Sequence, residues 1–238
     1  MARGRVKRRF PARRHIGPST VRPASSSRLS PLKLRILQNV IAACTICPSL
    51  KPWRRFESKA YGTPFTGFLL VGEAPGYASW KKRRRFTGPA GLLVRRALAQ
   101  AAHPRYRDLE DLFYMTDVVK CHPSPPENPA SNRAPRRAEV KACSQYLVRE
   151  IQVLAPSVIV TFGREAAEGV ARALDSAVES RSPRPRVLRF PHPSPRNQRT
   201  ILQQYRSMRA FEQALTDAFR DLIAELEAPR NVKREAGQ

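Results

Sequence analysis

Residues 72–91 read GEAPGYASWKKRRRFTGPAG, in which one glycine-rich turn precedes and another follows five consecutive positive charges. Glycine lets the backbone approach a ligand closely, and cationic side chains bind phosphate groups. We therefore predict a loop that holds a phosphate-bearing ligand, although a solvated run of surface charge is the competing interpretation. The glycines are Gly72, Gly76, Gly88 and Gly91. The charges, called the basic segment below, are Lys81, Lys82, Arg83, Arg84 and Arg85.

Four cysteines form the second group of residues with chemical potential. Cys44 and Cys47 have the C-x2-C spacing, and Cys121 and Cys143 flank a proline-rich loop. In a basic chain without a secretion signal, a shared metal is a better interpretation than disulfides or four independent buried thiols. Zinc accepts four thiolates, and so does an iron–sulfur cluster. The spacing alone does not choose between the two.

The elements that must position these residues follow from the hydrophobic pattern. Four β-prone apolar runs alternate with helix-like stretches such as 90–102 and 136–155. The runs are 65–73, 112–120, 157–163 and 186–193. This alternation predicts an α/β fold, a mostly parallel sheet with helices on both faces. Ligands of such folds bind at the carboxyl ends of strands. The GEAPG loop, the TDVVKCHP stretch and the PHPSP stretch all fall there.

Composition favours a polyanionic partner. The 238 residues include 44 Lys and Arg against 19 Asp and Glu, so the formal net charge is +25. Such a balance is the electrostatic footprint of a nucleic-acid-binding protein. A GC-rich genome would also enrich a protein in arginine, so charge alone gives only a modest preference for this partner.

We expect one folded domain, 31–226, between two disordered tails. Residues 1–30 hold nine Lys or Arg and no acid, so they bury too little apolar surface to fold. Residues 227–238 are polar as well. No stretch is apolar enough to span a membrane, and the basic start lacks the apolar core of a secretion signal. The expected location is cytoplasmic, of bacterial or archaeal type, while an Arg- and Ser-rich start also fits organelle import.

Six short motifs occur in a fixed order: VGEAPG, FTGPAGLL, YMTDVVKCHP, EVKAC, PSVIVTFG and HPSP. In this combination, 35–220 resembles the family 4 uracil-DNA glycosylases, which carry an iron–sulfur cluster. The resemblance implies a three-layer α/β/α sandwich on a four-stranded parallel sheet. It also implies that the four cysteines hold a [4Fe-4S] cluster and that the partner is DNA with a damaged base. We expect the protein to be a monomer.

The resemblance further implies roles for residues at the strand ends. The base must be flipped out of the duplex, and Phe86 matches the aromatic residue that stacks on it. His192 matches the residue that meets O2 of the base and stabilises the departing anion. Glu73 would lie near the sugar, where a carboxylate favours a cationic transition state or orients water. Further substrate contacts are expected from Gly72, Ala74, Pro75, Gly76 and Ser194, and DNA contacts from Arg196 and the basic segment.

Two departures from the family pattern concern the substrate. Where the family usually has Asn, this chain has Asp117, and an ionised carboxylate accepts the N3–H of uracil but repels O4. Either Asp117 is protonated or the preferred base differs, and the sequence predicts that Asp117→Asn raises uracil excision. Acidic residues that commonly follow GEAPG are also missing, which could lower the rate. The residues present instead are Tyr77, Ala78, Ser79 and Trp80.

The predicted function is therefore hydrolysis of the N-glycosidic bond of a damaged base, with uracil as the expected base. The product would be an abasic site for base excision repair. The alternative is an iron–sulfur nucleic-acid-binding protein of the same fold with lost or altered base specificity. The presence of Glu73, Phe86 and His192 argues against that alternative.

Overall fold

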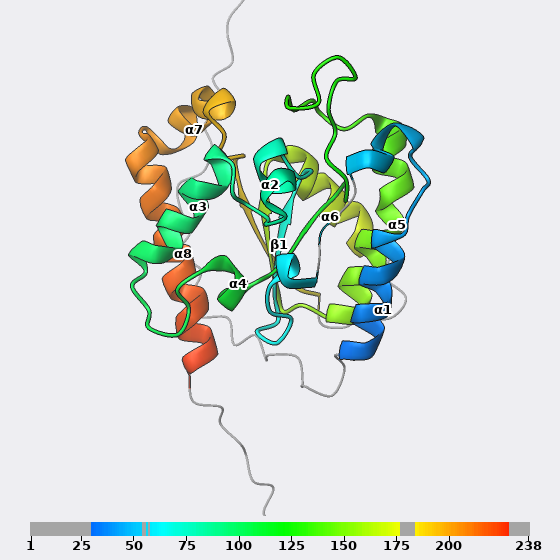
Figure 1. Cartoon of the computed structure of the whole chain (residues 1–238). Helices are drawn as coiled ribbons and strands as arrows, with labels where there is room; N and C mark the ends of the chain where they lie inside the picture. Colours follow the sequence, from blue (N-terminus) through cyan, green and yellow to red (C-terminus); the bar gives the residue numbers. More distant parts are fainter. Residues whose placement is uncertain (1–29, 54–55, 57, 177–183, 229–238) are drawn as a thin grey trace, which may run out of the picture.

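The structure is a computed structural model that describes residues 30–53, 56, 58–176 and 184–228. Its centre is a four-stranded parallel sheet with the strand order β2-β1-β3-β4 (Figure 1). Each strand lies within one of the four apolar runs, so the predicted α/β class is confirmed. The strands are β1 (Phe68–Gly72), β2 (Tyr114–Asp117), β3 (Val158–Phe162) and β4 (Arg186–Phe190).

Helices cover both faces of the sheet and complete three layers (Figure 1). Those packed on one face are α3 (Pro89–Gln100), α4 (Leu109–Leu112), α7 (Gln198–Tyr205) and α8 (Met208–Glu227). Those packed on the other face are α1 (Pro31–Ala42), α5 (Arg137–Leu154) and α6 (Arg164–Ser176). Shorter elements are α2 (Tyr77–Lys82) and the 3₁₀ turns η1 (Pro48–Trp53), η2 (Ser58–Tyr61) and η4 (Pro195–Asn197).

The central strand β1 shows why these residues form a sandwich. All five of its residues are buried, and its side chains alternate between the two faces of the sheet. Phe68 and Leu70 pack in the core that contains α3 and α8, whereas Leu69 and Val71 pack in the core that contains α5 and α6. A run that is apolar at every position suits a strand buried on both faces.

Most of the two predicted tails lies outside the described residues, since these begin at 30 and end at 228. The last helix, α8, ends at Glu227, close to the predicted domain boundary. Within the described part of the chain, no helix combines the length and the hydropathy needed to cross a membrane.

Candidate active site

The strand ends bring four predicted site residues to one edge of the sheet. Gly72 and Asp117 are partners in the parallel register, so the carboxyl ends of β1 and β2 are adjacent, and Glu73 follows at once. Gly163 directly follows β3 and has a φ of +88°, and a Cβ at that position would lie 3.1 Å from Cβ of His192. Gly163 is not among the site residues predicted above, although a glycine directly after an apolar strand is a usable signal.

Phe86 reaches the same edge from the segment between α2 and α3. Its ring packs edge-on against Phe162 at the end of β3, with 6.2 Å between the ring centroids. Its Cζ atom lies 3.5 Å from the point that a Cβ on Gly72 would occupy. Phe86 has a left-handed backbone (φ +53°), and Gly91 allows this turn, because a side chain at Gly91 would collide with the Phe86 backbone. The predicted stacking ring therefore faces the predicted glycine loop.

The hydrogen bonds of His192 define its tautomer. The backbone N–H of Ser194 donates to Nδ1 at 3.2 Å, so the proton of the neutral ring is on Nε2. Asn197 donates to the His192 carbonyl oxygen at 2.9 Å and anchors the backbone. Burial lowers the pKa of His192 from its ordinary value of 6.5, which favours the neutral form. His192 can thus present one neutral N–H donor to a ligand.

Glu73 lies in a partly buried, negatively charged environment. Burial is the main cause that raises its pKa above the ordinary 4.5, and the carboxylates of Glu165 and Asp117 raise it further. A carboxyl group of this kind takes up a proton at higher pH than an exposed glutamate does. Such a shift is common for groups that do acid–base or electrostatic work at an active site.

The long loop 122–136 holds the GEAPG loop and α2 through hydrogen bonds and ring stacking. Nδ1 of His122 lies 2.9 Å from the carbonyl oxygen of Pro75, and Asn132 Oδ1 accepts the first backbone N–H of α2 at 2.7 Å. Trp80, on α2, stacks on His122 with ring centroids 6.3 Å apart. Asn132 was not predicted from the sequence, because a loop without periodicity gives no signal for a contact 55 residues away.

The basic segment is divided by the structure. Lys81 and Lys82 end α2 and are exposed, as is Arg83, which has the left-handed conformation at the end of that helix. Arg84 turns toward α4 and forms an ion pair with Glu110, with 2.9 Å between Nε and Oε1. Three of the five cations are thus exposed at the end of α2, while the fourth takes part in an ion pair within the protein.

Arg85 corrects the prediction that the whole segment contacts DNA. Its side chain is only 1% exposed, and its Nη1 forms an ion pair with Oδ2 of Asp117. The guanidinium lies over the rings of Phe56 and Tyr61, at 4.4 Å and 4.8 Å from their centroids. A buried cation is stable only when it is paired, so Arg85 belongs to the wall behind the strand ends.

Arg85 also bears on the protonation of Asp117. Burial raises the pKa of Asp117, and the positive charges of Arg85 and Lys120 oppose that shift. Protonation of Asp117 would leave the buried guanidinium without its counter-charge, which is costly. Lys120 has its own partner, because its Nζ lies 2.6 Å from Oε2 of Glu150. We therefore treat Asp117 as a carboxylate at neutral pH.

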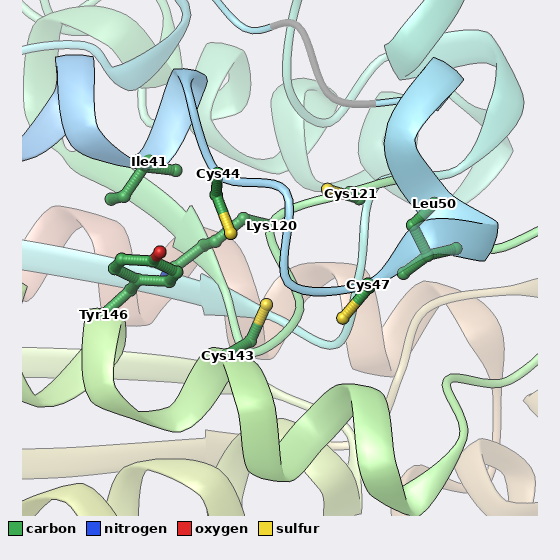
Figure 2. Close-up of a pocket in the computed structure, with 8 residues that line it drawn as sticks. All are labelled: Ile41, Cys44, Cys47, Leu50, Lys120, Cys121, Cys143 and Tyr146. Atoms are coloured by element: carbon green, nitrogen blue, oxygen red, sulfur yellow. The ribbon is translucent and has the colours of Figure 1, made fainter.

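The four cysteines line one pocket (Figure 2). Cys44 and Cys47 follow α1, Cys121 follows the end of β2, and Cys143 lies on α5. Burial is the main cause that raises the pKa of the Cys47 and Cys143 thiols, and neighbouring thiols contribute. The other residues that line the pocket are Ile41, Leu50, Lys120 and Tyr146.

The four thiols are the candidate metal ligands of this pocket. Within the described ranges, no three His, Cys, Asp or Glu side chains lie close enough together to hold a metal ion.

The fold and the strand-end residues define a class of site. A carboxylate, a neutral imidazole donor and an aromatic ring at the carboxyl edge of a parallel α/β sheet suit the cleavage of a bond to a stacked, departing anion. The model of the Uracil DNA glycosylase superfamily matches residues 60–218, which include every strand of the sheet and these three residues. The chain belongs to the uracil-DNA glycosylase superfamily.

Curated relatives support the same family. The type-4 uracil-DNA glycosylase of Pyrobaculum aerophilum is 34% identical over 148 residues, which cover 62% of this chain and 69% of that protein. Those of Sulfurisphaera tokodaii and Archaeoglobus fulgidus are 37% and 39% identical over 50% and 45% of this chain. The chain spans about half the length of these last two relatives, 51% and 48%.

Proposed function

We propose that this protein is a uracil-DNA glycosylase that flips uracil out of DNA and hydrolyses its N-glycosidic bond. The abasic product would enter base excision repair. The observation that carries the proposal is the placement of Glu73, Phe86 and His192 beside the carboxyl ends of the strands, within the segment that matches the superfamily. A protein that only bound nucleic acid would not need this combination.

Each of the three residues has a defined role in the proposed reaction. Phe86 provides an apolar wall on which the flipped base stacks. Cleavage leaves negative charge on uracil, and the Nε2–H of His192 is a preorganised donor to O2, where part of that charge accumulates. The Glu73 carboxylate favours positive charge on the sugar or orients the attacking water. Because His192 is neutral, it stabilises the anion without a proton transfer.

The surroundings of these residues fit a DNA substrate. The exposed cations Lys81, Lys82 and Arg83, together with Arg196 in η4, are proposed to contact phosphates that flank the flipped nucleotide. The backbone N–H groups of Ala74 and Gly76 remain candidate donors to the nucleotide. Pro75 and Ser194 also remain candidate substrate contacts, and their backbones position two histidines, because the Pro75 carbonyl oxygen accepts from His122 and the Ser194 N–H donates to His192. That the protein acts as a monomer stays a prediction.

We also propose that Cys44, Cys47, Cys121 and Cys143 hold a [4Fe-4S] cluster. The proposal is supported by the shared pocket of the four thiols and by similarity to type-4 relatives. When bound, the cluster would supply a structural cross-link between the segment after α1, the end of β2 and α5. Its ligands must be thiolates, so binding would displace protons from Cys47 and Cys143.

The activity can be tested with oligonucleotides that carry one uracil, single-stranded or paired with guanine. Alkali would then cleave the abasic sites that the protein forms. We expect uracil release by the natural protein and a loss of roughly 100- to 1,000-fold for His192→Ala, the range observed when one oxyanion donor is removed. Glu73→Gln should also lower the rate. Glu168→Gln on the exposed side of α6 is the matched control, and an unchanged rate for both site variants would contradict the assigned roles.

A further inference from the structure

The side chains of Asp117 and Phe86 border the space beside Gly72. A Cβ on Gly72 would collide with Oδ1 of Asp117 and lie 3.5 Å from Cζ of Phe86, so the carboxylate and the stacking ring border the same space. The other carboxylate oxygen, Oδ2, is bound by Nη1 of Arg85. One oxygen of Asp117 therefore faces the predicted base, and the other is committed to the guanidinium.

Two donor atoms of Arg85 have no partner in good hydrogen-bond geometry. Its Nε and Nη2 atoms are the buried side-chain nitrogen or oxygen atoms that have no hydrogen-bond partner in the described part of the chain. Buried donors are normally paired, so an unpaired buried guanidinium nitrogen calls for an explanation such as a bound acceptor. Both atoms belong to the planar group that binds Asp117, and they therefore lie close to its carboxylate.

The guanidinium is held firmly in this arrangement. Arg95, on α3, donates from Nη2 to the carbonyl oxygen of Arg85 at 2.6 Å and from Nε to that of Phe86 at 3.0 Å. The rings of Phe56 and Tyr61 contact the guanidinium itself. Arg85 and Phe86 are adjacent in sequence, and the Arg95 side chain binds both of their carbonyl oxygens. The guanidinium of Arg85 and the stacking ring of Phe86 are therefore held in a fixed relation to each other.

We propose that Arg85 and Asp117 act together as the group that reads uracil. Oδ1 of Asp117 accepts the N3–H of the base, and an N–H of Arg85 donates to the neighbouring O4. The pair thus supplies the adjacent acceptor and donor that one amide would supply, and the guanidinium cancels the repulsion between O4 and an isolated carboxylate. This inference rests on the proposed function and names the residues that would select its base.

The proposal reverses one expectation from the sequence. Asp117→Asn alone would give an amide at the correct place but would leave the buried Arg85 without its counter-charge. Removal of one partner from a buried ion pair is strongly unfavourable, whereas replacement of both partners by neutral groups is often tolerated. Both residues must therefore be replaced by neutral ones together, and each single substitution should lower the rate of uracil excision.

The test is a double-mutant cycle on uracil excision. Arg85→Met and Asp117→Asn should each lower the rate by roughly 100-fold or more, as expected when a buried reading group is left unmatched. The double variant, with its neutral amide, should recover to within roughly tenfold of the natural protein. Arg96→Met with Glu212→Gln is the matched control, because that ion pair links α3 to α8 and includes a largely exposed Arg96.

Folding and binding are measured beside activity. Thermal unfolding of every variant shows whether a low rate comes from unfolding, and Arg85→Lys, which keeps the charge but loses the forked donor, provides a milder change. Calorimetric binding of free uracil by the natural protein and each variant reports base reading without catalysis. If the natural protein binds uracil but releases none, the proposed function fails while the reading unit can still be judged from binding.

Three results would overturn the inference. The first is an Arg85→Met variant that folds and keeps the natural uracil rate and uracil affinity. The second is a folded double variant that performs no better than the single variants. The third is a natural protein that releases or binds cytosine in preference to uracil, because the Asp117 carboxylate would then read an amino group without help from Arg85.

Discussion

Glu73 and His192 determine how the activity should depend on pH. The pKa of Glu73 is raised above 4.5 by burial and nearby carboxylates, and the pKa of His192 is lowered from 6.5 by burial. In the proposed reaction the working forms are the Glu73 carboxylate and the neutral imidazole, and both are the deprotonated forms. A proton on Nδ1 of His192 would also break the hydrogen bond from Ser194.

We expect kcat/KM for uracil excision to be level between about pH 7 and 9 and to fall as the pH is lowered through the window between the two ordinary values, 6.5 and 4.5. Rates measured from pH 4 to 9 on a stable duplex test this expectation. Glu73→Gln should keep a low rate, and the fall of that rate at low pH should reflect the protonation of His192 alone. An excision rate that falls as the pH rises above 6.5 would mean that the imidazolium is the working form.

Single residues differ in how far the sequence can predict them. The positions of Glu73 and His192 are predictable because their motifs follow strands, and Phe86 stands in the FTGPAGLL motif. The role of Arg85 is not predictable, since five consecutive cations look alike until the backbone direction is known. The left-handed turns at Arg83 and Phe86 decide which side chain turns inward.

At the scale of elements, apolar periodicity locates the sheet well but its boundaries poorly. The first run covers 65–73, whereas β1 spans Phe68–Gly72, because residues with strand propensity continue into the flanking turns. The short helix α2 is not predicted at all. It buries only Ser79, so its sequence YASWKK carries no helical stripe of apolar residues.

The end of α2 leads to a prediction about DNA binding. A variant with Lys81→Gln, Lys82→Gln and Arg83→Gln should bind DNA more weakly with little regard to sequence. The slope of log affinity against log salt concentration should become less negative by up to about 2.7, which is about 0.9 for each phosphate that is no longer neutralised. Affinity would be measured at several salt concentrations on duplexes with and without uracil.

The control variant also removes three positive charges, but from the opposite end of the sheet, where the strands begin. Arg105 and Arg107 precede β2, and Arg220 donates to the carbonyl oxygen of Gln100 at the end of α3. Substitution of these three arginines by Gln should change the salt slope much less. Equal slopes for the two triple variants would show that charge acts through the whole molecule rather than through the end of α2.

At the scale of the whole molecule, the cysteine pocket joins segments that are far apart in the chain. Cys44 and Cys143 are 99 positions apart in the numbering, yet both line the pocket beside the end of β2 (Figure 2). The sequence predicts a shared site but does not choose its metal, because the spacing of thiols says little about how they converge.

We expect the proposed cluster to stabilise this arrangement. Cys143→Ala should lose iron, sulfide and the brown colour together, with loss of the broad absorbance near 400 nm expected for iron–sulfur proteins. A cross-link over so long a loop is worth a few kcal/mol, and a loss of about 3 kcal/mol would lower Tm by about 6–12 °C in a protein of this size. Ser144→Ala, at the next position on α5 and exposed, should change neither iron content nor Tm. Anaerobically purified protein that is colourless, active and loaded with one zinc per chain would refute the cluster, and the pocket would then have to close around a single ion.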